Sequence, residues 1–135
     1  MQLKNILVTG GAGFIGSNFV PYFVEKYSDY RIINLDKLTY AGDLSNVSEV
    51  ENNPRYTFVQ GDICDRGLIE QLFQENDIRG IIHFAAESHV DNSIKNPDSF
   101  MVTNVMGTFT LIDVARKYWM EAPKQYKVGY EDCLF

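Results

Sequence analysis

Short apolar runs alternate along the chain with longer amphipathic segments. The runs are rich in Val, Ile and Phe and predict strands over about residues 3–9, 31–36, 56–59 and 80–86. Apolar residues at helical spacing predict helices from Phe14 to Val24, from Leu68 to Asn76 and from Asp98 to about Met120. This alternation is typical of βαβ units. The sequence therefore predicts an α/β protein with a Rossmann-type, doubly wound parallel sheet covered by helices on both faces.

The remaining segments are polar or lack a clear period. Pro21 predicts a kink or bend in the first helix. Residues 39–53 and 87–97 are predicted loops, the first with a short helix near 44–50, and residues 121–132 are a third loop. The last residues, 133–135, are apolar enough to begin a fifth strand. One apolar stripe runs along the last predicted helix through Met101, Val102, Val105, Phe109, Ile112 and Ala115.

Composition and charge narrow the class of protein. The 135 residues are 45% hydrophobic, which is typical of one globular domain, and they hold 12 Lys and Arg against 18 Asp and Glu, a net charge of -6. An acidic chain without a basic cluster is not expected to bind nucleic acid or a membrane surface. The sequence has no apolar run of membrane-spanning length and no secretion-signal pattern, so we expect a cytoplasmic protein whose cysteines, Cys64 and Cys133, are free thiols.

A glycine motif separates the first strand from the first helix. Gly10, Gly13 and Gly16 form G-x-x-G-x-x-G, in which small residues let the backbone approach a pyrophosphate at the N-terminus of the helix. A glycine-rich string alone could be a structural turn. Here Asp36 ends the next strand about twenty residues later, where a carboxylate can accept hydrogen bonds from an adenosine ribose. Together, strand, glycines, helix and acid predict a dinucleotide site.

Asp36 also bears on the choice of dinucleotide. A carboxylate at the ribose would repel a 2′-phosphate, which favours NAD over NADP, although the neighbouring Lys37 offsets part of that charge. A ligand of such a sheet lies outside the carboxyl ends of the strands. Four such ends are predicted, at Gly10, at 36–39, at 62–63 and at 85–88.

Five segments resemble a known family. The sequences VTGGAGFIGSN, DKLTYAG, GDICD, FAAESHVD and TNVMGT resemble the NAD-dependent epimerase/dehydratase family of extended short-chain dehydrogenases/reductases, and within it the dTDP-glucose 4,6-dehydratases. The resemblance runs to about Trp119. The glycine motif is common to the whole superfamily, whereas DKLTYAG and AAESHVD are much more specific.

By position, the resemblance implies contacts to NAD at the four strand ends. Phe14 and Ile15 would lie along the pyrophosphate, and Asp62 and Ile63 at the adenine. The remaining implied contacts are Asp36, Lys37, Leu38 and Thr39 around the adenosine ribose and its phosphate, and Ala85, Ala86 and Thr103 on the nicotinamide side. Ser88 would face the sugar substrate. Asn92 stands where the family usually has Arg, so a basic contact to the substrate or a local salt bridge is absent there.

The family's reaction converts dTDP-glucose to dTDP-4-keto-6-deoxyglucose by oxidation, loss of water and reduction of the same sugar. Its acid and base residues are a Thr-Asp-Glu run and a Tyr-x-x-x-Lys pair beyond the fifth strand, and neither stands at that position here. The resemblance thus implies that residues 1–135 are the N-terminal part of the NAD-binding domain, truncated near the start of the fifth strand. We expect this part to bind NAD without catalysis and without the substrate domain. The full-length protein is expected to be a homodimer, with the stripe of the 98–120 helix either at the dimer face or in the core.

A few other side chains could act in catalysis or bind a ligand, but each also has a simpler structural interpretation. Tyr22 and Lys26 match Tyr-x-x-x-Lys, but on the first helix, far from any nicotinamide, so they are interpreted as a helix face. His83 is expected to be a hydrogen-bonded core histidine. His89 suits a polar role near substrate or a hydrogen bond that fixes its loop equally well. No metal-ligand spacing occurs, and no metal is predicted.

Two other functions remain open at this point. A related nucleotide-sugar epimerase or decarboxylase would share the glycine motif and Asp36, although AAESHVD favours the dehydratase. A stand-alone, non-catalytic NAD-binding module is the second alternative, because the expected catalytic residues are missing.

Overall fold

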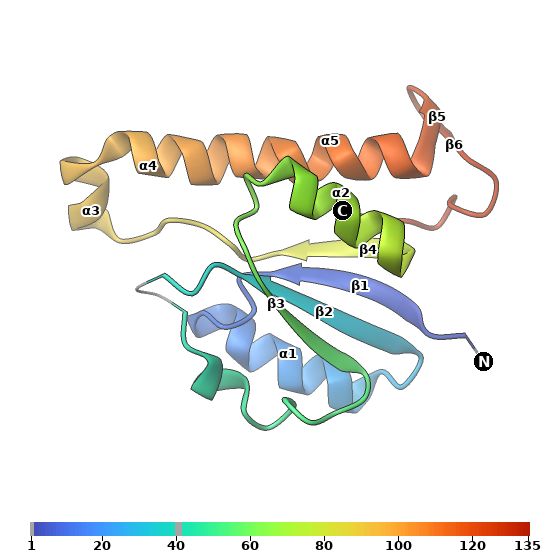
Figure 1. The fold of residues 1–135 in the computed structure, drawn as a ribbon, viewed down its shortest axis with the longest axis horizontal. Helices are drawn as coiled ribbons and strands as arrows, with labels where there is room; N and C mark the ends of the chain where they lie inside the picture. Colours follow the sequence, from blue (N-terminus) through green and yellow to red (C-terminus); the bar gives the residue numbers. More distant parts are fainter. Residues whose placement is uncertain (1, 40–41) are drawn as a thin grey trace.

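The computed structural model describes residues 2–39 and 42–135, and its centre is a four-stranded parallel sheet. The strand order is β3-β2-β1-β4, with bounds Lys4–Thr9 (β1), Tyr30–Asp36 (β2), Tyr56–Gln60 (β3) and Ile78–His83 (β4). Helix α1 (Phe14–Lys26) covers one face, and α2 (Arg66–Asn76) with α5 (Thr108–Trp119) covers the other, as Figure 1 shows. This confirms the predicted Rossmann-type architecture.

Two apolar cores follow from the alternation of side chains along β1 and β2. Leu7 and Ile33 pack with α2 and α5, in a core that includes Leu72 and Leu111. Their neighbours Ile6, Val8 and Ile32 point to the opposite face and pack with Val20 of α1. The last residues of these strands are therefore fixed by packing on both faces of the sheet, which gives the loops that follow them a rigid base.

Two predicted boundaries differ from the structure. The fourth strand ends at His83 rather than at Ala86, because its partner β1 ends at Thr9 and the chain turns away at Gly10. The last bond of this ladder runs from the N–H of Phe84 to the carbonyl oxygen of Thr9, at 2.9 Å. Helix α1 ends at Lys26 rather than near Val24, and Pro21 lies inside it.

The predicted loop 87–97 is wrong in part, because it contains α3 (Val90–Lys95). The predicted long helix consists of three consecutive segments: α4 (Pro97–Met101), a π-helical turn η2 (Val102–Gly107) and α5. Within the loop predicted for 39–53, the expected short helix is a 3₁₀ turn, η1 (Leu44–Val47).

The predicted apolar stripe does not lie in the core of this chain. We call its first five members the outer stripe, because all are exposed: Met101, Val102, Val105, Phe109 and Ile112. Of the stripe, only Ala115 is buried, and it packs beside Leu111, Val114 and Trp119 of the opposite side of α5. Helix α5 is apolar on two sides, and periodicity alone does not say which side meets the sheet.

The C-terminal segment is more ordered than predicted. Residues 121–132, expected to be a loop, include most of a small antiparallel hairpin of β5 (Met120–Ala122) and β6 (Gln125–Tyr126). Leu134 then pairs in parallel with Gly80 of β4, and its carbonyl oxygen accepts the N–H of Ile81 at 2.9 Å. The end of the chain thus adds to the sheet where a fifth strand was expected to begin. Within residues 2–39 and 42–135, no helix has the length and apolar character that crossing a membrane requires.

Candidate functional site

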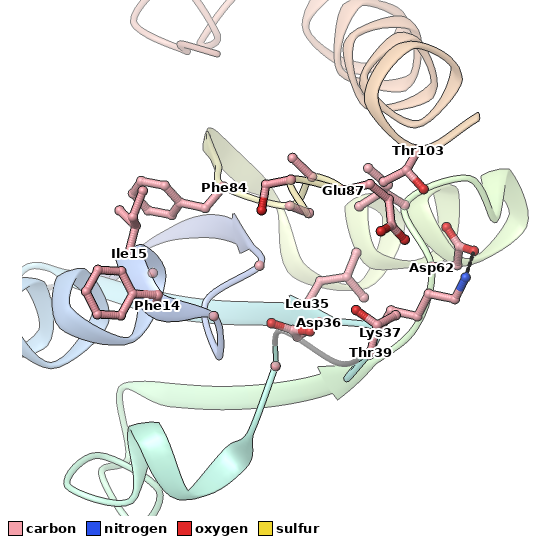
Figure 2. A pocket seen from close by; sticks show the side chains of 18 of the residues that line it. Phe14, Ile15, Leu35, Asp36, Lys37, Thr39, Asp62, Phe84, Glu87 and Thr103 are labelled. Atoms are coloured by element: carbon pink, nitrogen blue, oxygen red, sulfur yellow. Dashed lines mark ion pairs between the residues drawn. The ribbon is translucent and has the colours of Figure 1, made fainter. Parts of the chain in front are cut away.

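An open cavity lies at the carboxyl ends of the four parallel strands (Figure 2). Every cofactor or substrate contact named from the sequence lines it, with the exception of Leu38. The lining residues are Gly10, Gly13, Phe14, Ile15, Gly16, Leu35, Asp36, Lys37, Thr39, Gly42, Gly61, Asp62, Ile63, Phe84, Ala85, Ala86, Glu87, Ser88 and Thr103. Sequence reasoning missed Leu35, Gly42, Gly61, Phe84 and Glu87. All of these except Gly42 are next in the sequence to a predicted contact. Their position at the strand ends could therefore have identified them.

The glycine-rich turn brings the backbone close to the cavity. Gly10 has a φ of +69°, and a Cβ on it would stand 2.6 Å from the backbone nitrogen of Ala85. At Gly16, a Cβ would collide with the carbonyl oxygen of Gly10. Both positions therefore require glycine, one for its φ and its close approach to β4, the other for the contact between helix and turn.

The N-terminus of α1 opens into this cavity without a cap. The helix begins at Phe14 after Gly13; no side chain of the described residues caps it, and its first turn holds no acidic residue. The N–H groups of a first helical turn have no acceptor within the helix, and the helix dipole places partial positive charge there. Phe14 and Ile15 are 86% and 66% exposed beside this end. The arrangement suits an anionic group such as a pyrophosphate.

Asp36 is buried at the end of β2 and already accepts two backbone hydrogen bonds. Its Oδ2 accepts the N–H of Ala12 at 2.9 Å, and its Oδ1 accepts the N–H of Leu38 at 2.8 Å. Leu38 has a φ of +58°, so it turns the chain back over the carboxylate rather than lining the cavity. A carboxylate has about four acceptor positions, so Asp36 retains capacity for ribose hydroxyl groups. Tyr40 and Ala41 of the DKLTYAG segment lie outside the described residues.

An ion pair joins the ends of β2 and β3. The Lys37 Nζ lies 3.1 Å from Asp62 Oδ2, as the dashed line in Figure 2 marks. Burial acts to raise the pKa of Asp62, but the N–H of Cys64 and the ammonium group of Lys37 outweigh it and hold that pKa below its ordinary value. The Asp62 carboxylate is thus ionised at neutral pH and offsets the charge of Lys37 close to Asp36.

The opposite wall follows β4. Ala85, Ala86 and Ser88 lie after this strand, and Thr103 reaches the cavity from the π-helical turn η2. The next residue, Asn104, fixes this wall: its Oδ1 accepts the N–H of Glu87 at 2.8 Å, and its Nδ2 donates to the Glu87 carbonyl oxygen at 2.9 Å. Figure 2 shows Thr103 and Glu87 close together at this rim. Asn104 was missed, although it lies within the TNVMGT segment.

The side chain of Asn34, in β2, holds the glycine-rich turn in place. This residue was not identified from the sequence. Its fully buried side chain accepts the N–H of Gly11 at 3.0 Å and donates to the Tyr56 hydroxyl oxygen at 3.0 Å. A Cβ on Gly11 would overlap the Asn34 amide. An asparagine within an otherwise apolar buried strand was the signal that could have found it, because a buried amide needs partners.

The other candidate residues named from the sequence form hydrogen bonds within the protein and do not line the cavity. His83 is hydrogen-bonded on both ring nitrogens, as predicted, but it is half-buried at the end of β4 rather than enclosed in the core. His89 Nδ1 accepts the N–H of Asn92 at 3.4 Å and caps α3, which is the bond expected if it fixes its own loop. Tyr22 and Lys26 bond each other at 2.5 Å on α1, away from the strand ends.

Two further observations concern thiols and metals. Cys64 and Cys133 are both free. Over residues 2–39 and 42–135, no group of three or more His, Cys, Asp or Glu side chains is placed to hold a metal ion.

Comparison with known proteins relates this site to enzymes of nucleotide sugars. The family model described as GDP-mannose 4,6 dehydratase matches residues 7–129. The dTDP-glucose 4,6-dehydratase of Neisseria gonorrhoeae is 46% identical over 127 residues, which are 94% of this chain and 36% of that protein. The chain therefore spans about a third of the length of this relative.

Solved structures agree. The dTDP-glucose 4,6-dehydratase of Bacillus anthracis, crystallised in complex with NAD, matches at 50% identity and a TM-score of 0.75, covering 85% of this chain and 34% of that one. The UDP-glucose 4-epimerase of Thermotoga maritima, solved with UDP-glucose, matches at 34% identity and a TM-score of 0.74, covering 84% of this chain and 34% of that one.

Proposed function

Because this chain belongs to the GDP-mannose 4,6 dehydratase family, we propose that it is the NAD-binding part of a dTDP-glucose 4,6-dehydratase. The observation that supports this best is one cavity that joins an uncapped helix N-terminus to a buried acid, Asp36. The residues fit the cofactor, because the first turn of α1 has, among the described residues, no side-chain cap and no acidic residue that would compete with or repel a pyrophosphate. Bound NAD would supply reversible oxidation of a sugar carbon.

The two walls of the cavity suit the two halves of NAD. The N–H groups at Phe14, Ile15 and Gly16 would bind the pyrophosphate. Asp36, Lys37, Leu38 and Thr39 would surround the adenosine ribose, with Leu38 acting through its N–H to the Asp36 carboxylate. Asp62 and Ile63 would border the adenine, and Ala85, Ala86 and Thr103 the nicotinamide.

The charges near Asp36 favour NAD over NADP. A 2′-phosphate would approach a buried carboxylate that accepts hydrogen bonds from the N–H groups of Ala12 and Leu38 and that, within residues 2–39 and 42–135, pairs with no cation. Lys37, the cation that follows it in the chain, is paired with Asp62 instead. The expected repulsion of the 2′-phosphate is therefore largely retained.

The sugar substrate would bind on the side of the cavity that Ser88 lines. Ser88 follows Ala86 in the chain, and the hydroxyl group of Ser88 could hydrogen-bond a sugar that lies next to the nicotinamide. Asn92 of α3 offers no cation at the position where the family usually has Arg. We propose dTDP-glucose, or a similar nucleotide sugar, as the substrate of the whole protein.

We also propose that residues 1–135 form the N-terminal part of the NAD-binding domain and that the substrate domain lies outside them. The chain contains no Thr-Asp-Glu run, and its single Tyr-x-x-x-Lys pair, Tyr22 and Lys26, lies on α1. No residue of this chain is therefore assigned to catalysis, and we expect no conversion of dTDP-glucose by it. The cytoplasmic location stays a prediction.

The outer stripe supports a homodimer. Met101, Val102, Val105, Phe109 and Ile112 are each at least 45% exposed on one continuous helical rod. Exposed apolar surface of this extent is typical of a contact between proteins. A second copy of the same helix presents the same stripe, as the two-fold symmetric interface of a dimer requires.

An epimerase of nucleotide sugars remains the second candidate. The Thermotoga maritima epimerase matches this fold about as well as the dehydratase does, with TM-scores of 0.74 and 0.75. Sequence identity separates the two: 34% to the epimerase against 50% to the dehydratase. We therefore favour the dehydratase over both the epimerase and a non-catalytic NAD-binding module.

Nuclear magnetic resonance of the labelled chain tests this proposal residue by residue. AMP is expected to shift the amide signals of Asp36 and Asp62, and nicotinamide mononucleotide those of Ala86 and Thr103. NAD should shift all four, together with Phe14. If NAD leaves these signals unchanged, or shifts only residues outside the cavity, the proposed function is wrong.

A further inference from the structure

His83 lies between two threonines from different elements, the end of β1 and the start of α5. Its Nδ1 is 2.6 Å from the hydroxyl oxygen of Thr9, the last residue of β1. Its Nε2 is 2.9 Å from the hydroxyl oxygen of Thr108, the first residue of α5. The imidazole therefore spans the gap between the sheet and the helix that follows Thr103.

The neighbours of the two threonines fix the direction of these hydrogen bonds. The N–H of Ala85 donates to the Thr9 hydroxyl oxygen at 3.2 Å, and Thr9 is fully buried, so its single hydroxyl hydrogen needs an acceptor, which within the described residues is His83 Nδ1. At the other side, the Thr108 hydroxyl donates to the carbonyl oxygen of Asn104 at 2.8 Å, because a carbonyl only accepts. The Thr108 oxygen must then accept a hydrogen from His83 Nε2. The ring is consequently neutral, with its hydrogen on Nε2.

These hydrogen bonds connect the glycine-rich turn with the wall of the cavity on the nicotinamide side. Thr9 directly precedes Gly10, the donor Ala85 lines the nicotinamide side, and Asn104 adjoins Thr103 and holds Glu87. Burial lowers the pKa of His83, which agrees with a neutral ring.

We propose that His83 is a positioning residue: as the neutral Nε2–H tautomer, it holds the glycine-rich turn against the wall formed by Ala85 and Thr103. This role rests on the proposed function, because its purpose is to set the distance between the pyrophosphate and nicotinamide ends of the NAD site. If the imidazole were protonated, Nδ1 would carry a hydrogen, and the hydroxyl hydrogen of the buried Thr9 would lose the acceptor that it has among the described residues.

The tautomer is measured directly from the ¹⁵N signals of the imidazole ring in the chain without ligand. A His89→Asn variant, in which asparagine preserves the cap of α3, leaves His83 as the single histidine. At neutral pH we expect Nδ1 to resonate as an unprotonated nitrogen and Nε2 as a protonated one. A protonated Nδ1 at neutral pH would overturn the proposal, whether or not the chain binds NAD.

The positioning role is tested by three substitutions in α5. Thr108→Val removes the hydroxyl group that His83 contacts and is expected to weaken NAD binding about threefold to tenfold. Thr108→Ser keeps that hydroxyl group and should restore the affinity. Thr110→Val is the matched control: Thr110 is also in α5 and donates in the same way to a carbonyl oxygen four residues back, that of Met106, at 2.9 Å, but it lies outside the chain of bonds through His83.

The outcomes separate positioning from general stability. Weaker NAD binding by Thr108→Val alone, with both Val variants equally stable to heat, supports the proposal. Equal losses of affinity in Thr108→Val and Thr110→Val would overturn it. A wild-type chain that does not bind NAD would overturn the proposed function and this role with it, while the ¹⁵N signals would still decide the tautomer.

Discussion

The carboxylate of Asp36 accepts a hydrogen bond of 2.9 Å from the backbone N–H of Ala12, so the acid at the end of β2 is bound to the glycine-rich turn after β1. A second bond, from Leu38, holds the same carboxylate from the other side. Asp36 therefore has two roles in this account: it shapes the turn that would bind the pyrophosphate, and it would accept the ribose hydroxyl groups.

Asp36→Ala is expected to reduce both NAD affinity and stability. The loss of the ribose hydrogen bonds should weaken NAD binding by about 1–3 kcal/mol, as measured by calorimetry. The N–H groups of Ala12 and Leu38 also lose their acceptor, so the unfolding temperature should fall. Asp43→Ala is the control, because the Asp43 carboxylate accepts the N–H of Ser45 in the exposed turn η1 and, among the described residues, bonds no part of the glycine-rich turn. Unchanged NAD affinity in Asp36→Ala would remove this residue from the site.

Gly10→Ala should be more damaging than Gly129→Ala. Both glycines have positive φ, +69° and +88°, so each substitution costs about 1–2 kcal/mol of backbone strain. A Cβ at Gly129 meets nothing within 4 Å, whereas one at Gly10 meets the backbone nitrogen of Ala85, just after β4, at 2.6 Å. Chemical denaturation measures the difference in free energy of unfolding, and equal losses would show that the turn does not need this close approach.

Stability should decrease in acid because of His83. Burial lowers the pKa of this imidazole below its ordinary value of 6.5. Between these two pKa values the imidazole is protonated in the unfolded chain and neutral in the folded chain. The free energy of unfolding is therefore expected to rise with pH through the range between the lowered pKa and 6.5, by at most about 1.4 kcal/mol per pH unit for this group. Above pH 6.5 its contribution is constant.

Denaturation of the wild type and of His83→Gln across this pH range measures that contribution. The free energy of unfolding of the variant should rise less steeply with pH than that of the wild type, because the variant lacks the titrating imidazole, whatever its absolute stability. If the two proteins show the same slope, His83 is not a partly buried imidazole that stays neutral in the folded chain.

The outer stripe makes a prediction about self-association. Phe109 is 53% exposed, so Phe109→Glu should leave the fold intact and shift a dimer towards monomer. Val128→Glu is the control, because Val128 is 95% exposed and lies outside the stripe. Analytical ultracentrifugation measures both. A wild-type chain that stays monomeric at high concentration would contradict a dimer formed by this stripe alone.

The sequence predicted the sheet and most of the cavity because their signals are local. Gly10 and Asp36 stand at strand ends, and in a parallel sheet all such ends meet at one edge. Gly16 lies in the first turn of the helix that follows Gly10. The outer stripe was harder to interpret, because α5 is apolar on two sides and only the packing of Trp119 and Leu111 shows which side meets the sheet.

The supporting residues could not be assigned from the sequence. Asn34 and Asn104 act through backbone groups of Gly11 and Glu87, which are distant in sequence and become neighbours only in the folded chain. The bonds through His83 depend in the same way on Thr9 and Thr108, which lie on separate elements. Local patterns identify the residues that line the cavity, whereas the residues that hold them in place depend on tertiary contacts.

We propose that this cavity binds NAD and that Asp36 selects against the 2′-phosphate of NADP. Calorimetric titration of the 135-residue chain with NAD and, in parallel, with NADP tests both statements together. We expect NAD to bind at a single site and NADP to bind at least tenfold more weakly, with this preference reduced in Asp36→Ala. Absence of NAD binding by the folded wild-type chain, or equal affinity for the two dinucleotides, would contradict this proposal.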